Sequence, residues 1–276
     1  MRILHLVSYS LYSGPVPSTV GLAMAQRALG HTVWLAYDTK RGNFNDFEEA
    51  AAPRLRGAQL APPLPLSLSA KSSPRELWRD WRTLRGFLGA NGADVVHTHL
   101  SHDHALVALA GASGVRRVRT FHASRSLAPR RGQTWLNRCG DGWIVRCGRH
   151  RDTLLHAFDA REDRVAVIPG SIDAAAWRLA GDVVEVRGRL RAAWGVPDDV
   201  PLLGHVALIA GRGQEELVYA VHRLGALAPH VVFVGRGERE TGLRALVRRL
   251  GVDAKVAFAG YLQGPALVEA YAAVDA

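Results

Sequence analysis

The chain of 276 residues is long enough for two ordinary domains, and its 48% hydrophobic residues can form a sizeable core. Its formal net charge of +10 is compatible with nucleic acid, an anionic membrane surface or a phosphate-bearing substrate, although arginine-rich composition is also common in proteins of GC-rich genomes. No helix-turn-helix, zinc-finger or RNA-binding signature stands out, so we expect no nucleic-acid partner.

Short apolar segments alternate with amphipathic segments through the first 168 residues, which predicts parallel strands joined by helices. Strands are predicted at residues 2–7, 31–37, 93–98, 115–120, 140–145 and 164–168. Helices are predicted at 18–29, 74–89, 101–112 and 150–158. The second of these helices has Leu77, Trp81, Leu84 and Leu88 on one face, the pattern of a helix packed on a sheet.

Residues 41–73 are less regular, and their prolines predict a helix, a short strand near residues 59–60 and a long loop. Further on, Val165 and Ile168 predict a short buried strand, and Pro169 and Gly170 end its regular pairing. We expect a hinge at this point.

The hinge separates two expected α/β domains, residues 1–168 and 169–276, and ligands usually bind in the cleft between such units. In the second domain, strands are predicted at 201–209, 230–234 and 255–258, and helices at 187–194, 214–227, 238–250 and 265–273. A complete doubly wound domain has about six strands. We therefore expect this domain to be incomplete and the chain to be truncated at its C-terminus, with residues 274–276 entering a further strand.

The sequence gives no sign of membrane insertion or of an oxidising compartment. No apolar run approaches the roughly 20 residues that span a bilayer. Cys139 and Cys147 match neither a zinc motif nor a disulfide framework and read as ordinary thiols. We expect a soluble cytoplasmic protein.

Two candidate ligand contacts follow strands of the first domain. Ser13 and Gly14 lie between the first strand and a helix, where a backbone turn or a phosphate or sugar contact is expected. His122 follows the strand that ends at Thr120, where open α/β sheets bind ligands. Its ring could bind a sugar hydroxyl or carry a proton, or it could be held in the loop by backbone carbonyls.

A run of histidines follows Asp94. Strand alternation puts His97 and His99 on one face, with the spacing that a metal site on a strand could use. A zinc site would need a third ligand, and His102 and His104 belong to the next helix, where they need not converge with the pair. We therefore expect no metal and place His99 at a strand end that lines the cleft.

Two glycine-rich turns follow strands of the second domain. Arg212 lies between two glycines ahead of a predicted helix, where a guanidinium can reach a diphosphate. The turn of Gly235, Arg236 and Gly237 repeats this arrangement, but a Gly-x-Gly without a third glycine is weak evidence for a dinucleotide.

In this order, the motifs of the chain resemble those of the GT-B glycosyltransferases of family 4, retaining enzymes that use nucleotide-diphosphate sugars. The matching stretches are the early glycine loop, DVVHTH at 94–99, RTFH at 119–122, VIPGSID at 167–173, VFVGRG at 232–237 and FAGYL at 258–262. The resemblance implies two Rossmann-like doubly wound parallel-sheet domains that face a cleft.

The resemblance also implies roles for matching residues. Gly14 would lie at the acceptor and diphosphate end of the cleft, His122 near the transferred sugar, and Arg212 against the donor diphosphate. The nucleotide would be bordered by the glycines of the second turn and by a following loop, namely Gly235, Gly237, Tyr261 and Leu262. Such enzymes generally need no bound metal, because basic side chains and helix ends stabilise the diphosphate, so no cofactor is expected.

Three departures from the family pattern bear on activity. Ser13 stands where members commonly have the first of two glycines, and Ala207 and Leu208 stand where an arginine is usual. The family's paired glutamates, which grip the donor, would lie beyond Ala276.

We expect a retaining transferase that moves a sugar from a nucleotide-diphosphate donor to a glycan or lipid-linked acceptor in cell-envelope assembly, with an optional peripheral contact at the inner membrane. The alternatives are an inactive fragment or non-catalytic nucleotide-sugar-binding scaffold and, less favoured, a GT-B sugar-nucleotide epimerase.

Overall fold

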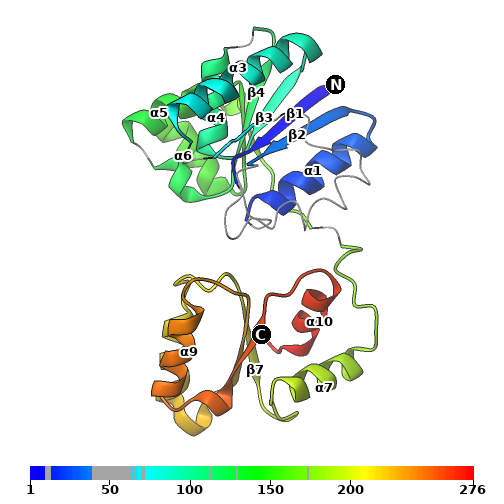
Figure 1. The fold of residues 1–276 in the computed structure, drawn as a ribbon, viewed down its shortest axis with the longest axis vertical. Coiled ribbons are helices and arrows are strands. Elements are labelled where there is room, and N and C mark those ends of the chain that lie inside the picture. Colours follow the sequence, from blue (N-terminus) through cyan, green and yellow to red (C-terminus); the bar gives the residue numbers. More distant parts are fainter. Residues whose placement is uncertain are drawn as a thin grey trace. The chain divides into compact units, whose positions relative to one another are not determined.

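The computed structural model describes residues 1–9, 14–38, 64, 66–69, 72–111, 113–128, 130–172 and 174–276. The chain forms two compact units, Met1–Ile172 and Asp173–Ala276 (Figure 1). The sequence boundary was placed four residues earlier, after Ile168. The helix and short strand predicted between residues 41 and 63 lie outside the described residues, and so does Ser13.

Unit 1 contains a sheet of six parallel strands in the order β2-β1-β3-β4-β5-β6 (Figure 1). The strands are β1 Arg2–Val7, β2 Thr32–Tyr37, β3 Val95–Thr98, β4 Arg116–Phe121, β5 Gly142–Val145 and β6 Val165–Val167. All six lie at or close to the predicted positions. All six are parallel, and most are largely apolar, as expected for a sheet whose crossovers are helices; β4, which contains Arg116, Arg117 and Arg119, is the exception.

Among the residues that the structure describes, the α-helices of unit 1 are α1 Val16–Ala28, α3 Pro74–Asn91, α4 Ser101–Ala110, α5 Arg131–Arg138 and α6 Gly148–Phe158. Helix α1 begins before the predicted Ser18, because proline is tolerated in a first turn. Helix α3 begins with a capping box between Ser73 and Glu76 and ends at Gly92, whose φ is 58°. The sequence did not predict α5, which has few apolar residues and therefore no clear periodicity.

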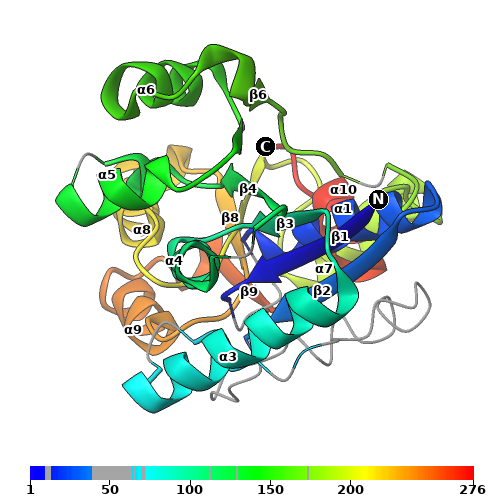
Figure 2. The same cartoon turned by 90° about the horizontal axis from the view of Figure 1, so that it is seen from above.

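Alternation along β1 sends successive side chains to opposite faces of the sheet. Leu4 and Leu6 pack in the same cluster as residues of α3 and α4. Ile3 and Val7 pack with residues of α1. Figure 2 shows α1 on one side of this sheet and α3, α4, α5 and α6 on the other. His5 therefore lies on the α1 face.

Two burial predictions for unit 1 were wrong. The strand at Val165 is the last of its sheet, and Val167 and Ile168 are 41% and 52% exposed, because β6 pairs only with β5. In α3, Leu77 is 37% exposed although Leu84 and Leu88 are buried. One turn after Leu77, the carboxylate of Asp80 occupies a fully buried position that the apolar pattern could not reveal.

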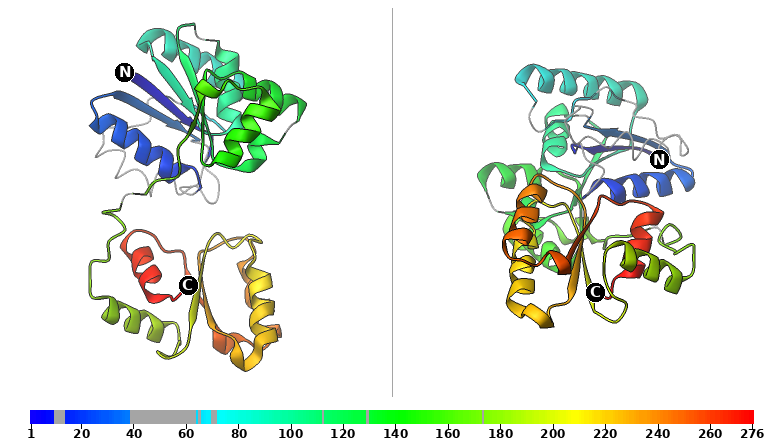
Figure 3. Two further views of the ribbon diagram at one scale, coloured as in Figure 1. Left: turned by 180° about the vertical axis from the view of Figure 1, so that it is seen from behind. Right: turned by 60° about the horizontal axis from the view of Figure 1, so that its bottom comes forward.

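Unit 2 contains three parallel strands in the order β7-β8-β9. Its elements are α7 Val183–Ala193, β7 Leu202–Val206, α8 Gln214–Leu224, β8 His230–Val234, α9 Glu240–Arg249, β9 Val256–Gly260 and α10 Pro265–Ala273. Helices α7 and α10 lie together on one face, and α8 and α9 lie on the other (Figure 3). Beside β7, Asp275 N–H donates to Leu202 O at 2.9 Å and Gly204 N–H donates to Ala276 O at 2.7 Å. The last residues thus lie alongside β7, although they do not form the predicted further strand.

Among the described residues, no helix combines the length and the apolar character needed to cross a bilayer.

Candidate functional site

Unit 1 has a pocket of about 380 Å³ on the α1 face of its sheet. Side chains of β1, β3, β4 and β5 form its floor: Ile3, Val95, His97, Val118, Thr120 and Ile144. One wall is helix α1, through Ser18, Thr19, Leu22 and Gln26. The opposite wall consists of His122, Arg146 and the segment from Ile168 to Ser171.

The predicted residues His99 and His122 meet at this pocket. His99 Nδ1 lies 3.0 Å from His122 Nε2 and 3.1 Å from Thr19 Oγ1. On its other side, His99 Nε2 lies 3.2 Å from His5 Nδ1. His122 thus contacts another side chain of the site rather than being held by backbone carbonyls.

The sequence argument missed His5 and Gln26. His5 pairs in register with His97 across β1 and β3, so both rings lie on the α1 face. The outward Nε2 of His5 donates to Gln26 Oε1 at 2.7 Å, and His97 Nε2 lies 2.7 Å from Thr120 Oγ1. One signal in the sequence could have found His5. It is a polar residue between Ile3 and Val7, on the same face of the first strand as both.

Burial keeps these histidines neutral. Burial lowers the pKa of His5 to about 4, although the hydrogen bond that His5 donates to Gln26 raises it, and burial lowers the pKa of His97 and His99 well below 6.5. Burial, with the nearby Arg146, lowers the pKa of His122 to about 4. Each ring therefore offers one N–H donor and one lone pair at neutral pH.

Gly14 lies in an exposed turn just ahead of α1, with φ of 58°. A Cβ at this position would meet nothing within 4 Å, so the glycine is required by its left-handed backbone rather than by crowding. Helix α1 has no side-chain cap at its N-terminus. The backbone N–H groups of its first turn are thus available to a ligand.

Arg119, which belongs to the RTFH motif, does not face the pocket. It points to the opposite face of the sheet, where its side chain is 1% exposed. Its Nη1 donates to Asn137 Oδ1 at 2.6 Å and its Nη2 donates to Ser101 Oγ at 2.9 Å. It therefore holds α4 and α5 on the sheet.

The predicted donor-binding residues of unit 2 gather at the carboxyl ends of its three strands. Arg212 lies between β7 and α8, Gly235 and Gly237 between β8 and α9, and Tyr261 and Leu262 after β9. Open parallel sheets bind ligands at this edge. The structure brings these five residues to one edge of unit 2, as it brings His99 and His122 to one pocket of unit 1.

Gly235 and Gly237 allow two loops to touch. A Cβ on Gly235 would lie 2.0 Å from Ala207 O, and one on Gly237 would lie 2.2 Å from Ile209 O. Backbone hydrogen bonds join the same loops, from Ile209 N to Arg236 O at 3.1 Å and from Arg239 N to Ile209 O at 3.2 Å. These glycines thus fix the loop that leads to Arg212.

Three arginines occur in the loops at this edge. The Arg212 side chain is exposed and has no partner among the described residues. Arg236, which the sequence argument did not select, lies over the Tyr261 ring at 4.9 Å. Arg239 lies 3.5 Å from Glu215. Helix α8 begins after Gly213, whose φ is 88°, and has no side-chain cap.

Solved structures with similar folds include HepE of Anabaena in complex with UDP and glucose, with a TM-score of 0.72 and 15% identity over 100% of this chain and 72% of that chain. Sucrose-phosphate synthase of Thermosynechococcus elongatus has a TM-score of 0.73 and 15% identity over 100% and 74%. UDP-GlcNAc 2-epimerase of Neisseria meningitidis has a TM-score of 0.60 and 13% identity over 99% and 75%. At these identities the likeness shows the α/β fold of the GT-B class.

A comparison with curated protein sequences gave no match. The model of Glycosyltransferase Family 4 matches residues 12–176, which include DVVHTH at 94–99, RTFH at 119–122 and VIPGSID at 167–173. Because this match covers more than half of the 276 residues, the chain belongs to glycosyltransferase family 4 and is a glycosyltransferase.

Proposed function

We propose that the protein transfers a sugar from a nucleotide-diphosphate donor to a glycan or lipid-linked acceptor, with retention of anomeric configuration. The observation that carries the proposal is the edge of unit 2, where an unpaired arginine, an uncapped helix start and two close-packed glycine turns lie together. Family membership supports the reaction class, and the complex of HepE with UDP and glucose supports the donor class.

The donor diphosphate would bind at the start of α8. The first N–H groups of a helix point along its axis and attract anions, and Gly213 adds no side chain that would compete for them. Arg212 would add a planar fork of donors. This site stabilises the leaving diphosphate with protein groups, so the proposal needs no metal at the donor.

The nucleotide would lie against the loops after β8 and β9. Arg236 and Tyr261 form one stacked pair there, and a half-buried Leu262 packs against the core beside them. An aromatic ring with an arginine above it presents both a flat apolar surface and a positive charge. Such a surface suits a nucleotide, whose base is flat and whose phosphates are negative.

His122 would contact the transferred sugar. Its ring is neutral at pH 7, so it acts through hydrogen bonds rather than through a positive charge. Nε2 is engaged with His99, whereas Nδ1 is buried and has no partner among the described residues. That nitrogen is therefore left for a sugar hydroxyl, and His99 would hold the ring in place.

The acceptor side of the proposal rests on the family resemblance. We propose an acceptor in cell-envelope glycan or glycolipid assembly, a cytoplasmic location and a peripheral contact with the inner membrane. The net charge of +10 is compatible with an anionic membrane surface.

Donor binding is tested by titrating the chain with UDP and with UDP-glucose in a calorimeter. Removal of one charge-assisted contact in Arg212→Ala should weaken binding by about 10–100-fold. Arg223→Ala removes an exposed arginine from the last turn of α8 and should leave the affinity unchanged. Equal affinities of wild type and Arg212→Ala would remove Arg212 from the donor site.

The reaction is tested with UDP-glucose and a panel of lipid-linked and free glycans, with product anomers assigned by NMR. A product of inverted configuration would refute the retaining mechanism. Because an epimerase is among the structural neighbours, the donor is also incubated alone. Conversion of the sugar without an acceptor would favour an epimerase, and failure to bind any donor would favour a scaffold.

A further inference from the structure

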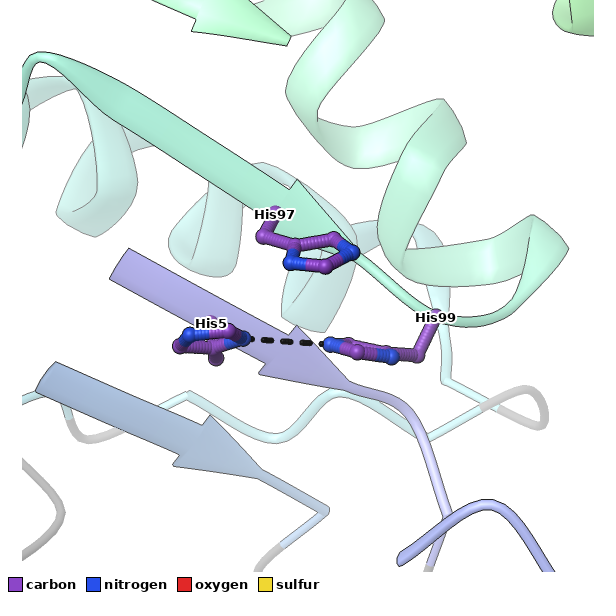
Figure 4. Close-up of side chains that lie close together, drawn as sticks. All are labelled: His5, His97 and His99. Atoms are coloured by element: carbon purple, nitrogen blue, oxygen red, sulfur yellow. Dashed lines mark hydrogen bonds between the residues drawn. The ribbon is translucent and has the colours of Figure 1, made fainter. Parts of the chain in front are cut away.

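Three histidine rings converge beneath helix α1 in unit 1. His5 and His97 come from neighbouring strands, and His99 follows the end of β3 (Figure 4). Their ring centroids lie 4.4–5.5 Å apart, and one ring nitrogen from each lies within 4.8 Å of the others. The three side chains are 0–3% exposed. Their approach is therefore fixed by the sheet rather than by a mobile surface.

The other nitrogens of these rings face oxygen atoms. His5 Nε2 faces Gln26 Oε1, and His97 Nε2 faces Thr120 Oγ1. His99 Nδ1 faces Thr19 Oγ1 at 3.1 Å and also His122 Nε2 at 3.0 Å. Histidines that bind metals usually have this outer partner, because an N–H donated to an oxygen fixes the tautomer and turns the lone pair toward the ion.

If His99 donates from Nδ1 to Thr19 Oγ1, the hydrogen-bond roles of His5 and His99 conflict, and a cation between them would remove that conflict. Thr19 Oγ1 donates its hydrogen to Pro15 O at 2.9 Å, so its oxygen is left to accept from His99 Nδ1. Gln26 Oε1 accepts from His5 Nε2. With both N–H groups directed outward, His5 Nδ1 and His99 Nε2 face each other as lone pairs at 3.2 Å.

We propose that His5, His97 and His99 form a three-histidine site for a divalent transition metal such as Zn²⁺. In a tetrahedral zinc site with Zn–N bonds of 2.0–2.1 Å, neighbouring nitrogens lie about 3.3 Å apart. The 3.2 Å between His5 Nδ1 and His99 Nε2 matches one edge of that tetrahedron. Imidazole ligands without carboxylates select zinc, copper or nickel over magnesium and calcium.

The pocket supplies the access and the fourth position that such a site needs. His97, His99 and Thr120 line it, so an ion or water can reach the rings from the α1 face. The metal site lies in unit 1 and does not involve the edge of unit 2 proposed to bind the donor diphosphate. It shares His99 with the proposed sugar contact, because His99 Nδ1 lies 3.0 Å from His122 Nε2, but the proposed diphosphate contacts of unit 2 do not depend on it.

The competing arrangement has no metal. In it, His122 Nε2 donates to His99 Nδ1, His99 Nε2 donates to His5 Nδ1, and His5 Nε2 donates to Gln26 Oε1, in a continuous line. Metal binding moves the hydrogen of His99 from Nε2 to Nδ1. The two states therefore differ in the ring nitrogens that carry hydrogen, which ¹⁵N NMR of the histidine side chains distinguishes.

The test uses the full chain, treated with EDTA, dialysed and titrated with Zn²⁺ by calorimetry and with Co²⁺ by visible absorption. We expect one ion per chain and the intense d–d bands of tetrahedral Co²⁺, displaced by Zn²⁺. His97→Asn should weaken binding at least about 100-fold, and Gln26→Ala, which leaves all three ligands, by about 10–100-fold. His222→Asn and Cys147→Ser alter exposed positions and should change nothing.

The Gln26→Ala variant keeps the test decisive if His97→Asn fails to fold, which far-UV circular dichroism reports. The site is supported if the wild-type chain binds one ion, if His97→Asn and Gln26→Ala bind it more weakly, and if the His99 hydrogen moves to Nδ1 on metal binding. The proposed metal site is wrong if the wild-type chain binds no ion, or if the affinity is unchanged in both His97→Asn and Gln26→Ala. The histidines would then form the metal-free line of hydrogen bonds. Because donor titrations of wild type and Arg212→Ala are made without metal, their outcome does not depend on this result.

Discussion

Replacing Gly237 with alanine tests whether this glycine is needed for the packing of the loop after β8 against the loop after β7, rather than for direct contact with the donor. The added Cβ would lie 2.2 Å from Ile209 O, 2.7 Å from its carbonyl carbon and 2.9 Å from its nitrogen. Real Cβ contacts are essentially never shorter than 3.0 Å, so the two backbones must separate by 3.0 − 2.2 = 0.8 Å or more. Backbone atoms cannot move aside as a flexible side chain does.

The cost follows from what the separation would break. The backbone of Ile209 takes part in the two hydrogen bonds that join these loops, with Arg236 and with Arg239. Each is worth about 0.5–1.5 kcal/mol, and overpacking adds about 1–3 kcal/mol. We therefore expect Gly237→Ala to lower the free energy of unfolding of unit 2 by about 2–6 kcal/mol, a large part of a domain's stability.

Gly242→Ala is a matched control in the same unit. Gly242 lies within α9, and a Cβ there would meet nothing within 4 Å. Alanine is the better helix former, so this change should stabilise unit 2 by about 0.5–1 kcal/mol. The same substitution is thus expected to have opposite signs at two glycines five positions apart.

Hydrogen exchange of the β8 amides, followed by mass spectrometry, reports the stability of unit 2 alone. Exchange should be at least about 30-fold faster in Gly237→Ala and a few-fold slower in Gly242→Ala. The packing argument would be wrong if the β8 amides of Gly237→Ala exchanged at the wild-type rate while the affinity for UDP fell. Gly237 would then contact the ligand rather than allow the two loops to pack.

Three further predictions concern single buried or capping groups. Asp80→Ala leaves the N–H groups of Ser67 and Leu68 without their acceptor and should cost about 2–5 kcal/mol in urea unfolding of unit 1, whereas Asp80→Asn should cost less. Asp182→Ala removes the N-cap of α7 and should cost about 1 kcal/mol, read from exchange of the α7 amides. Burial lowers the pKa of His104 to about 3, below its unfolded value of 6.5, so its contribution to stability is present above pH 6.5 and is lost on acidification. From pH 7.5 to 5.5 His104 alone should account for slightly more than about 1 kcal/mol of lost stability, and His104→Gln should reduce the pH dependence of the stability read from the α4 amides by that amount.

The strands were predictable because a parallel sheet buried by helices demands short apolar runs. Every strand of both sheets lies at or near its predicted position, including β6, whose burial was wrong. Burial depends on neighbours, and the sequence does not say which strand lies at an edge. The polar Asp80, which binds the backbone at Ser67 and Leu68, was missed for a similar reason, since hydropathy assigns polar residues to the surface.

Only part of the histidine cluster could be predicted from the sequence. The pair His97 and His99 was visible as an alternating pattern at the end of one strand, and a third ligand was the missing requirement. His5 meets this requirement through the pairing of β1 with β3, which joins residues 92 positions apart. Strand order is a property of the folded sheet, so neither His5 nor its partner Gln26 could be assigned from spacing.

In the proposed donor site of unit 2, the glycine turns would link packing to donor binding. Only because Gly235 and Gly237 lack side chains can the loop after β8 touch the loop after β7, and this contact holds residues 207–209 against the core. The same loop continues through Arg212 to the uncapped start of α8. Loss of donor affinity in a glycine variant would therefore report a displaced arginine and helix end, even if no glycine touched the donor. If the proposed donor site is right, stability and donor affinity fall together in Gly237→Ala, whereas donor affinity alone falls in Arg212→Ala. That difference separates residues that position the site from residues that bind the donor.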